Sequence, residues 1–159
     1  MLRLHGDALW RLTAGYAFQP ADREDLYQEV LLAVWRALPR FRGESSLRTF
    51  VYRIAHNRGM TFRGRVAARA RREAEVPPDL RDSRPGADTT LDARLARQRL
   101  LEAVRRLPLS LSRTVMLSLE GLSYAEIAEV MDITENNVGV RLHRARAALE
   151  ELLAEGREP

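Results

Sequence analysis

Apolar residues recur at three- and four-residue intervals along most of the chain, which is the spacing of an amphipathic helix. The clearest example follows Asp22, the expected N-cap, and carries Asp25 in its first turn. Pro39 and Gly43 end the pattern in a loop. The apolar stripe of this predicted helix consists of Leu26, Val30, Leu31, Val34, Trp35 and Leu38.

Two further predicted helices flank this one. Residues 4–17 supply Leu9, Trp10 and Leu12, and a later helix begins after Ser46, which we expect to cap it. The apolar side of the later helix consists of Leu47, Phe50, Val51, Ile54 and Ala55. Three amphipathic helices suffice for a minimal bundle.

Residues 76–90 contain Pro77, Pro78, Pro85 and Gly86 with little periodicity, which is typical of a flexible linker. Helical spacing then resumes, and no strand-like alternation occurs in either half. The expected buried residues of this part are Leu95, Leu100, Leu101, Val104 and Leu107, then Leu111, Val115, Met116 and Leu119 after the break at Pro108. We therefore predict an all-α protein with two small helical domains, residues 1–75 and 91–159, joined by a linker over residues 76–90.

Residues 121–146 have the pattern of a helix-turn-helix. Gly121 fits the position after a helix end, and Ser123 with Glu126 forms a capping box that opens a short helix. A tight turn is expected at residues 131–132, and Thr134 then caps a second helix. The residues expected to seat this helix on its partner are Val138, Leu142, Ala145 and Leu149.

The opposite face of the second helix carries side chains that suit DNA. Asparagine pairs bidentately with adenine and arginine with guanine in the major groove, near the start of a recognition helix. The face consists of Asn136, Asn137, Val140, Arg141, His143 and Arg144. A helical hairpin with a solvated charged face is the alternative. We favour DNA binding because residues 139–148 contain arginines and no acidic residue.

The charge of the chain is uneven. All 26 basic residues are arginine, against 22 acidic residues, and residues 1–75 hold 14 of the arginines and only 8 of the acids. The densest cluster consists of Arg58, Arg63, Arg65, Arg69, Arg71 and Arg72. Such a cluster attracts phosphate, although a solvated basic helix end would have the same composition.

Several classes of protein are excluded by what the sequence lacks. The absence of cysteine excludes a disulfide scaffold, a zinc ribbon and a thiol nucleophile. The sequence has no apolar run of about 18 residues, which a membrane span would need, so we expect a cytoplasmic protein. The sequence contains no paired carboxylates, no phosphate-binding glycine loop and no nucleophile–base pair. We therefore expect a protein that is not an enzyme and that has no cofactor and no small-molecule substrate. His143 has no second ligand at helical spacing, so no metal site is expected.

Both halves resemble extracytoplasmic-function sigma factors of the sigma-70 family. DLYQEV (25–30), WRALPRFRGESSLRTF (35–50) and YRIAHN (52–57) are similar to region 2. LP (107–108), LEGLSYAEIA (119–128) and VGVRLHRAR (138–146) are similar to region 4, in the family's order. The resemblance implies a bacterial transcription initiation factor that binds core RNA polymerase and directs it to specific promoters.

The resemblance also implies partners. Region 2 would dock on the clamp helices of the largest polymerase subunit through Asp25, Gln28, Glu29 and Leu32, which share one helix face. Region 4 would sit on the flap of the second-largest subunit. An anti-sigma factor is expected to clamp both regions, and a membrane-bound one would hold the chain at the inner membrane. Composition alone favours a solvated helix for the residue 25–32 face.

Region 2 would read the −10 element. Its loop over residues 41–46 would capture a flipped base, since unstacking is offset by stacking and edge hydrogen bonds in a pocket. Without the resemblance, Phe41 would be interpreted as core packing. On the next helix we expect the polar face to point outward, with Arg63 and Arg65 extending phosphate contact. The implied −10 contacts are Phe41, Arg42, Ser45, Ser46, Arg48, Thr49, Tyr52, Arg53, His56 and Asn57.

Region 4 would read the −35 element through Thr134, Asn136, Asn137, Val140, Arg141, His143 and Arg144. The chain departs from the family pattern at three positions: Phe50 replaces a common tryptophan, His56 replaces an arginine, and Gly139 replaces a lysine or arginine. Gly139 removes one expected DNA contact and costs about 1 kcal/mol of helix propensity, so we expect a different −35 preference.

One other class of function remains open. A dimeric helix-turn-helix transcription regulator would bind DNA without affinity for core polymerase, but it would leave residues 25–57 unexplained. The first predicted helix is also about ten residues shorter than the family's usual start, which is consistent with a natural start upstream of Met1.

Overall fold

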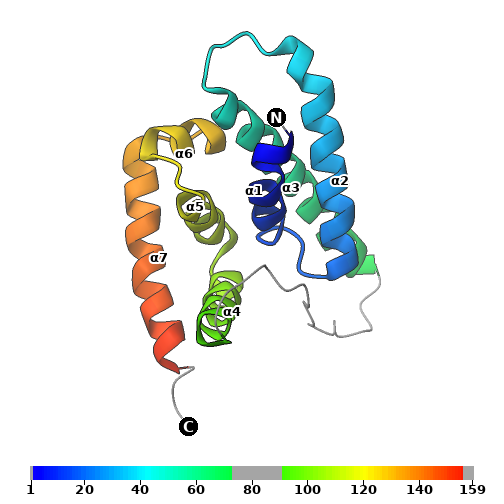
Figure 1. Cartoon of the computed structure of the whole chain (residues 1–159). Helices are drawn as coiled ribbons and strands as arrows, with labels where there is room; N and C mark the ends of the chain where they lie inside the picture. Colours follow the sequence, from blue (N-terminus) through cyan, green and yellow to red (C-terminus); the bar gives the residue numbers. More distant parts are fainter. Residues whose placement is uncertain (1, 73–90, 156–159) are drawn as a thin grey trace. The chain divides into compact units, whose positions relative to one another are not determined.

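The computed structural model describes residues 2–72 and 91–155 of the chain (Figure 1). These ranges contain only helices and their connections, so the all-α prediction is confirmed. The predicted linker over residues 76–90 lies outside the described residues. The elements are α1 (Leu2–Thr13), α2 (Pro20–Ala37), the 3-10 turn η1 (Leu38–Arg40), α3 (Leu47–Arg72), α4 (Leu91–Arg106), α5 (Leu109–Leu119), α6 (Tyr124–Met131) and α7 (Glu135–Glu155).

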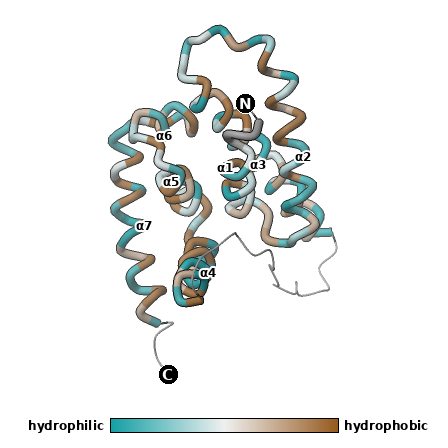
Figure 2. Tube along the Cα trace, viewed as in Figure 1, coloured by the Kyte–Doolittle hydropathy of each residue, from teal (hydrophilic) through white to brown (hydrophobic). Residues whose placement is uncertain are grey.

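The described helices divide into two compact units, one with α1–α3 and η1 and the other with α4, α5, α7 and most of α6. In the first unit, α2 and α3 pack on each other and α1 packs on both. In the second, α7 packs on α4 and α5. Hydrophobic and hydrophilic segments alternate along the helices of both units, as expected for elements with one buried face (Figure 2).

The core of the first unit includes three of the six apolar residues predicted for α2, because Leu26, Val30 and Val34 are buried. The prediction for Trp35 is wrong, since its side chain is 64% exposed. One residue beyond Val34 turns the side chain by about 100° around the helix, away from the core. Asp22 is not the N-cap, because the helix begins at Pro20, whose fixed φ suits the first turn.

Helix α3 begins as predicted and runs for 26 residues. The Thr49 backbone N–H donates to the Ser46 hydroxyl oxygen at 3.0 Å, which confirms Ser46 as the cap. The expected outward face is wrong in its centre, however, since Thr49, Tyr52 and His56 are buried. These positions follow one another at offsets of three and four and form a stripe that faces inward.

A hydrogen bond in the first unit explains the burial of His56. Tyr16 lies three residues beyond the end of α1, and its hydroxyl is 2.7 Å from His56 Nδ1. Gly59 lies one turn further along α3, where an added Cβ would lie only 2.4 Å from Tyr16 Cγ. The Tyr16 ring therefore rests against the α3 backbone at a distance that only glycine permits.

The core of the second unit differs from the prediction at two positions, Leu95 in α4 and Leu119 in α5. Helix α4 buries Ala103 and Val104 near its C-terminal end, whereas Leu95 is 44% exposed. The prediction for Leu95 is therefore wrong, because residues 91–99 are exposed along their whole length. Leu119 is also exposed, at 55%, as the last residue of α5.

The contact between Gly59 and Tyr16 yields a stability prediction. Replacing Gly59 with alanine should lower the free energy of unfolding by about 1–3 kcal/mol, the usual cost of overpacking, in spite of better helix propensity. Thermal unfolding followed by circular dichroism should show a midpoint several degrees lower, at about 4–8 °C per kcal/mol for a unit of this size.

Gly64→Ala is the matched control, because a Cβ there would meet nothing within 4 Å. It should stabilise the same helix by up to about 1 kcal/mol. Equal unfolding temperatures for the two variants would contradict the close packing of Tyr16 on α3.

Candidate nucleic-acid interfaces

The sharp entry into α6 is made by Gly121, which has φ +77° and follows the end of α5. The Gly121 N–H donates to the Ser118 carbonyl at 2.9 Å, and the Leu122 N–H donates to the Leu117 carbonyl at 3.3 Å. This pair of bonds is a Schellman motif, which satisfies carbonyls that the helix end leaves free. The predicted role of Gly121 is confirmed.

The capping box at the start of α6 is also confirmed. The Ser123 N–H donates to Glu126 Oε2 at 2.7 Å, and the Glu126 N–H donates to the Ser123 hydroxyl oxygen at 3.2 Å. Two otherwise free backbone donors are thereby paired.

The turn between α6 and α7 depends on Asp132, whose φ of 55° is in the left-handed region. The next residue, Ile133, donates its N–H to the Ala128 carbonyl at 3.0 Å and so closes the end of α6. The Asn137 N–H then donates to the Thr134 hydroxyl oxygen at 3.2 Å, which confirms Thr134 as the cap of α7. The tight turn predicted for residues 131–132 is thus present, with a strained residue at its centre.

Helix α7 buries one face and exposes the opposite one. Val138 and Ala145 are fully buried. The exposed or partly exposed residues include every predicted DNA contact on this helix: Asn136, Asn137, Val140, Arg141, His143 and Arg144. Arg141 is only half-buried, at the edge of the exposed face. The face thus presents amides and guanidinium groups that suit base edges and phosphates.

Sequence reasoning missed one residue on this surface. Tyr124, the first residue of α6, is 49% exposed. With Asn136, Gly139, Val140 and other α7 residues it lines a hollow of about 550 Å³. The available signal was a tyrosine directly after the Ser123 cap, because the first residue of a helix has few helical neighbours to cover it.

The loop before α3 contains the other predicted contacts. The rings of Phe41 and Phe50 lie 4.9 Å apart, and Phe41 is half-buried, so its ring packs on the domain without being part of the core. Gly43, with φ +75°, turns the loop, and Arg42 is exposed. Ser46 is exposed but its hydroxyl is already engaged in capping α3.

On α3 the predicted contacts do not form one surface. Arg48 and the pair Arg53 and Asn57 lie on opposite sides of the buried stripe that contains Tyr52 and His56. The Arg48 guanidinium lies 5.8 Å from the centre of the Tyr52 ring. Arg48 and Arg53 are half-buried and Asn57 is exposed, whereas Thr49, Tyr52 and His56 are buried and support the fold.

Two of the arginines expected to contact phosphate have partners within the first unit. Arg65 Nη2 lies 2.7 and 2.8 Å from the two carboxylate oxygens of Glu29. Arg63 lies 4.8 Å from the centre of the Phe18 ring. Glu29, predicted to bind polymerase, is thus paired as well. An exposed ion pair contributes little stability, so a stronger partner could replace it.

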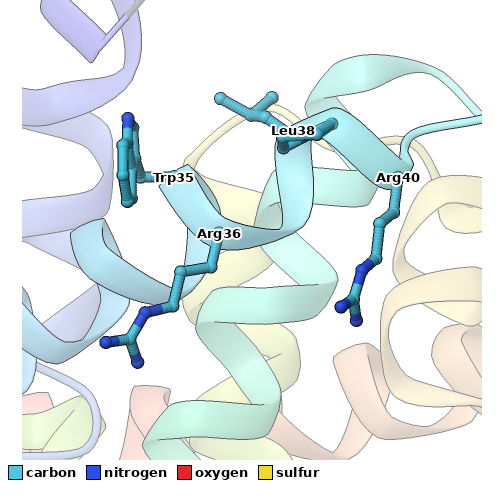
Figure 3. A pocket seen from close by; sticks show the side chains of 5 residues that line it. Trp35, Arg36, Leu38 and Arg40 are labelled. Carbon is cyan, nitrogen blue, oxygen red and sulfur yellow. The ribbon is translucent and has the colours of Figure 1, made fainter.

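The exposed face of α2 is larger than predicted. Asp25, Gln28 and Leu32 are exposed, as a docking face requires. Trp35 joins them at three residues from Leu32 and seven from Gln28, a spacing that sequence reasoning could have used. At the end of α2, Trp35, Arg36, Leu38, Pro39 and Arg40 line a hollow of about 610 Å³. Figure 3 shows Arg36 and Arg40 extending to one side of this segment and Leu38 to the other.

Other kinds of site find little support among the described residues. No group of three or more histidine, aspartate or glutamate side chains there is placed to hold a metal ion. None of the described helices combines the length and the apolar character needed to cross a membrane.

Comparisons with known proteins match both units. The family model for sigma-70 region 2 matches residues 1–72, and that for sigma-70 region 4 matches residues 97–149. The chain is 34% identical over 139 residues to the ECF RNA polymerase sigma-E factor of Haemophilus influenzae, covering 81% of this chain and 73% of the relative. It is 33% identical over 142 residues to the protein of the same name in Escherichia coli, covering 81% and 72%.

Two solved structures are similar in fold. One is the sigma factor RpoE in complex with the anti-sigma factor NepR from Bartonella quintana, with a TM-score of 0.78, 24% identity, and 96% and 94% of the two chains covered. The other is CnrH in complex with the cytosolic domain of CnrY, with a TM-score of 0.69, 24% identity, and 97% and 85% covered.

The left-handed residue in the α6–α7 turn generates a prediction. Asp132→Gly should raise the free energy of unfolding by about 1 kcal/mol, since glycine adopts positive φ without the steric cost of a Cβ. Chemical denaturation of the full chain should show a higher midpoint with an unchanged slope. Gly121→Asp is the matched reverse change and should destabilise by a similar amount. A lower midpoint for Asp132→Gly would contradict the assignment of strain to this turn.

Proposed function

The chain belongs to the extracytoplasmic-function group of the sigma-70 family, and we propose that its two helical units divide promoter recognition between them. Members of this family are not enzymes: they direct RNA polymerase, which performs the chemistry. The observation that carries the proposal is the match of both family models, in order, together with the exposed face of α7. The proposed boundaries are residues 1–75, a linker over residues 76–90, and residues 91–159.

The second unit is proposed to bind the −35 element with α7 in the major groove. Asn136 and Asn137 lie in the first turn, where a recognition helix meets base edges. Val140, Arg141, His143 and Arg144 follow along the same side, and Thr134 caps the helix beside the DNA. The same unit is proposed to rest on the flap of the second-largest polymerase subunit.

The first unit is proposed to bind the clamp helices of the largest polymerase subunit through the exposed face of α2, which is Asp25, Gln28, Leu32 and Trp35, with Glu29 released from Arg65. Its −10 contacts are proposed to come from the residue 41–46 loop and from the surface residues of α3. Those residues are Phe41, Arg42, Ser45, Ser46, Arg48, Arg53 and Asn57.

We propose regulation by an anti-sigma factor, by analogy with the two similar structures. One of them is a complex with the anti-sigma factor NepR, and the other is a complex with the cytosolic domain of CnrY. An anti-sigma factor would cover the α2 and α7 faces and so compete with polymerase and DNA. The proposed location is the cytoplasm, or the inner membrane where the anti-sigma factor is membrane-bound.

Run-off transcription with purified core polymerase on a promoter library tests the division of labour. Arg141→Ala combined with Arg144→Ala should reduce −35-dependent initiation at least tenfold, because each bidentate arginine–guanine pair is worth about 1–3 kcal/mol. Core binding, measured by co-purification, should stay unchanged.

The matched control is Arg97→Ala with Arg99→Ala, which removes the same charge from exposed positions of α4 in the same unit. It should leave initiation near the wild-type level. Loss of core binding in the α7 variant would overturn the division of labour, and a chain that binds duplex DNA as a symmetric pair without polymerase would overturn the whole proposal.

The Trp35 side chain gives a second functional prediction. Trp35→Ala should weaken core binding about tenfold or more, since exposed tryptophans that become buried in an interface dominate its energy. The unfolding midpoint should change little, because the ring contributes no core packing. Leu91→Ala, at a residue that is 72% exposed on α4, is the control. Unchanged affinity of the Trp35 variant for core polymerase in a titration would remove Trp35 from the docking face.

A further inference from the structure

The hollow on α7 has an unusual lining for a DNA-reading surface. It is lined by Gly139, which has no side chain, and by the half-exposed ring of Tyr124 and the half-exposed side chain of Val140. Asn136 lies one turn earlier on α7 and lines the same hollow. An apolar depression is therefore placed within the face that is proposed to meet base edges.

The packing of the chain does not require glycine at this position. A Cβ at Gly139 would lie 3.6 Å from Tyr124 Cε2, which is ordinary van der Waals contact. Alanine would also favour the helix, because glycine inside a helix is destabilising. The space at Gly139 thus has no occupant among the described residues, and a group that approaches α7 from outside can enter it.

The side chains that line the hollow match some base edges of the major groove better than others. A basic side chain at position 139 would bring donors to guanine, whereas glycine and valine bring none. The 5-methyl group of thymine is the one apolar group that a base pair displays there, and the amide of Asn136 matches the N6 and N7 edge of adenine. The other polar residues that line the hollow are Glu135, His143 and Arg144.

We propose that the hollow formed by Tyr124, Gly139 and Val140 seats the 5-methyl group of a thymine in the −35 element, with Asn136 on a neighbouring adenine. The inference rests on the proposed function, because it takes α7 to be the −35-reading helix. It assigns Gly139 and Val140 as specificity-determining residues. Contact with the thymine methyl group would then replace the contact that a basic side chain at position 139 would make.

The test uses the full chain with core polymerase and a duplex library randomised in the −35 window. The sequences that the holoenzyme retains should share a thymine at one fixed position. Replacing that thymine with deoxyuridine, which lacks only the methyl group, should weaken binding about fourfold, the effect of burying one methyl group.

Two variants separate this effect from folding. Val140→Ala should bind the thymine and deoxyuridine duplexes equally. Gly139→Ala should unfold at a higher temperature than the wild type and yet lose the methyl preference, because its Cβ occupies the hollow. Deoxyuridine placed in the −10 element is the matched DNA control and should affect wild type and variants alike.

The outcomes distinguish the two levels of the proposal. Retention of −35 sequences without a methyl effect at any thymine would overturn the inference alone, as would an undiminished methyl effect in both variants. Failure of the holoenzyme to retain any −35 sequence would overturn the proposed function together with the inference.

Discussion

The DNA-reading surface depends on how four helix ends are satisfied within about twenty residues. A helix leaves its first N–H groups and last carbonyls without partners, and each must find one locally or from water. Here the end of α5, both ends of α6 and the start of α7 are all closed by nearby groups, among them Gly121, Ser123, Glu126 and Thr134. Because the hydrogen-bond partners lie so close in sequence, local chemistry sets the geometry of the turn between α6 and α7. That turn determines the orientation of α7 relative to α6.

This locality explains which parts of the molecule could be predicted from sequence. The caps of α6 and α7, the short turn and the exposed side of α7 follow from residue types at fixed offsets, and the structure confirms them. The exposure of Trp35, Leu95 and Leu119 was not predicted. Apolar periodicity identifies a helix, but it does not show how much of that helix the other helices cover. The buried stripe of Thr49, Tyr52 and His56 was missed for a related reason. The neighbouring helices cover a wider part of the circumference of α3 than the positions of its apolar residues indicate.

The number of arginines in residues 1–75 does not by itself identify a phosphate-binding surface. The arginine excess of residues 1–75 suggested a phosphate-binding cluster, yet Arg65 pairs with Glu29, and Arg63 lies beside the ring of Phe18. Arg23 likewise lies 4.2 Å from the centre of the Trp10 ring and donates to the Trp10 carbonyl. A guanidinium group has five donors and a flat face, so it stabilises packing as readily as it binds phosphate.

The contact of Tyr16 with His56 and Gly59 has a consequence for building chimaeras between this protein and its relatives. The ring, the imidazole and the missing Cβ come from two segments some forty residues apart, and none of the three is useful without the others. A grafted α3 with any side chain at position 59 would place that side chain against the native Tyr16 ring, where no space exists. Exchanges that carry both segments together would preserve the fit, so the unit to exchange is the whole three-helix body rather than α3 alone.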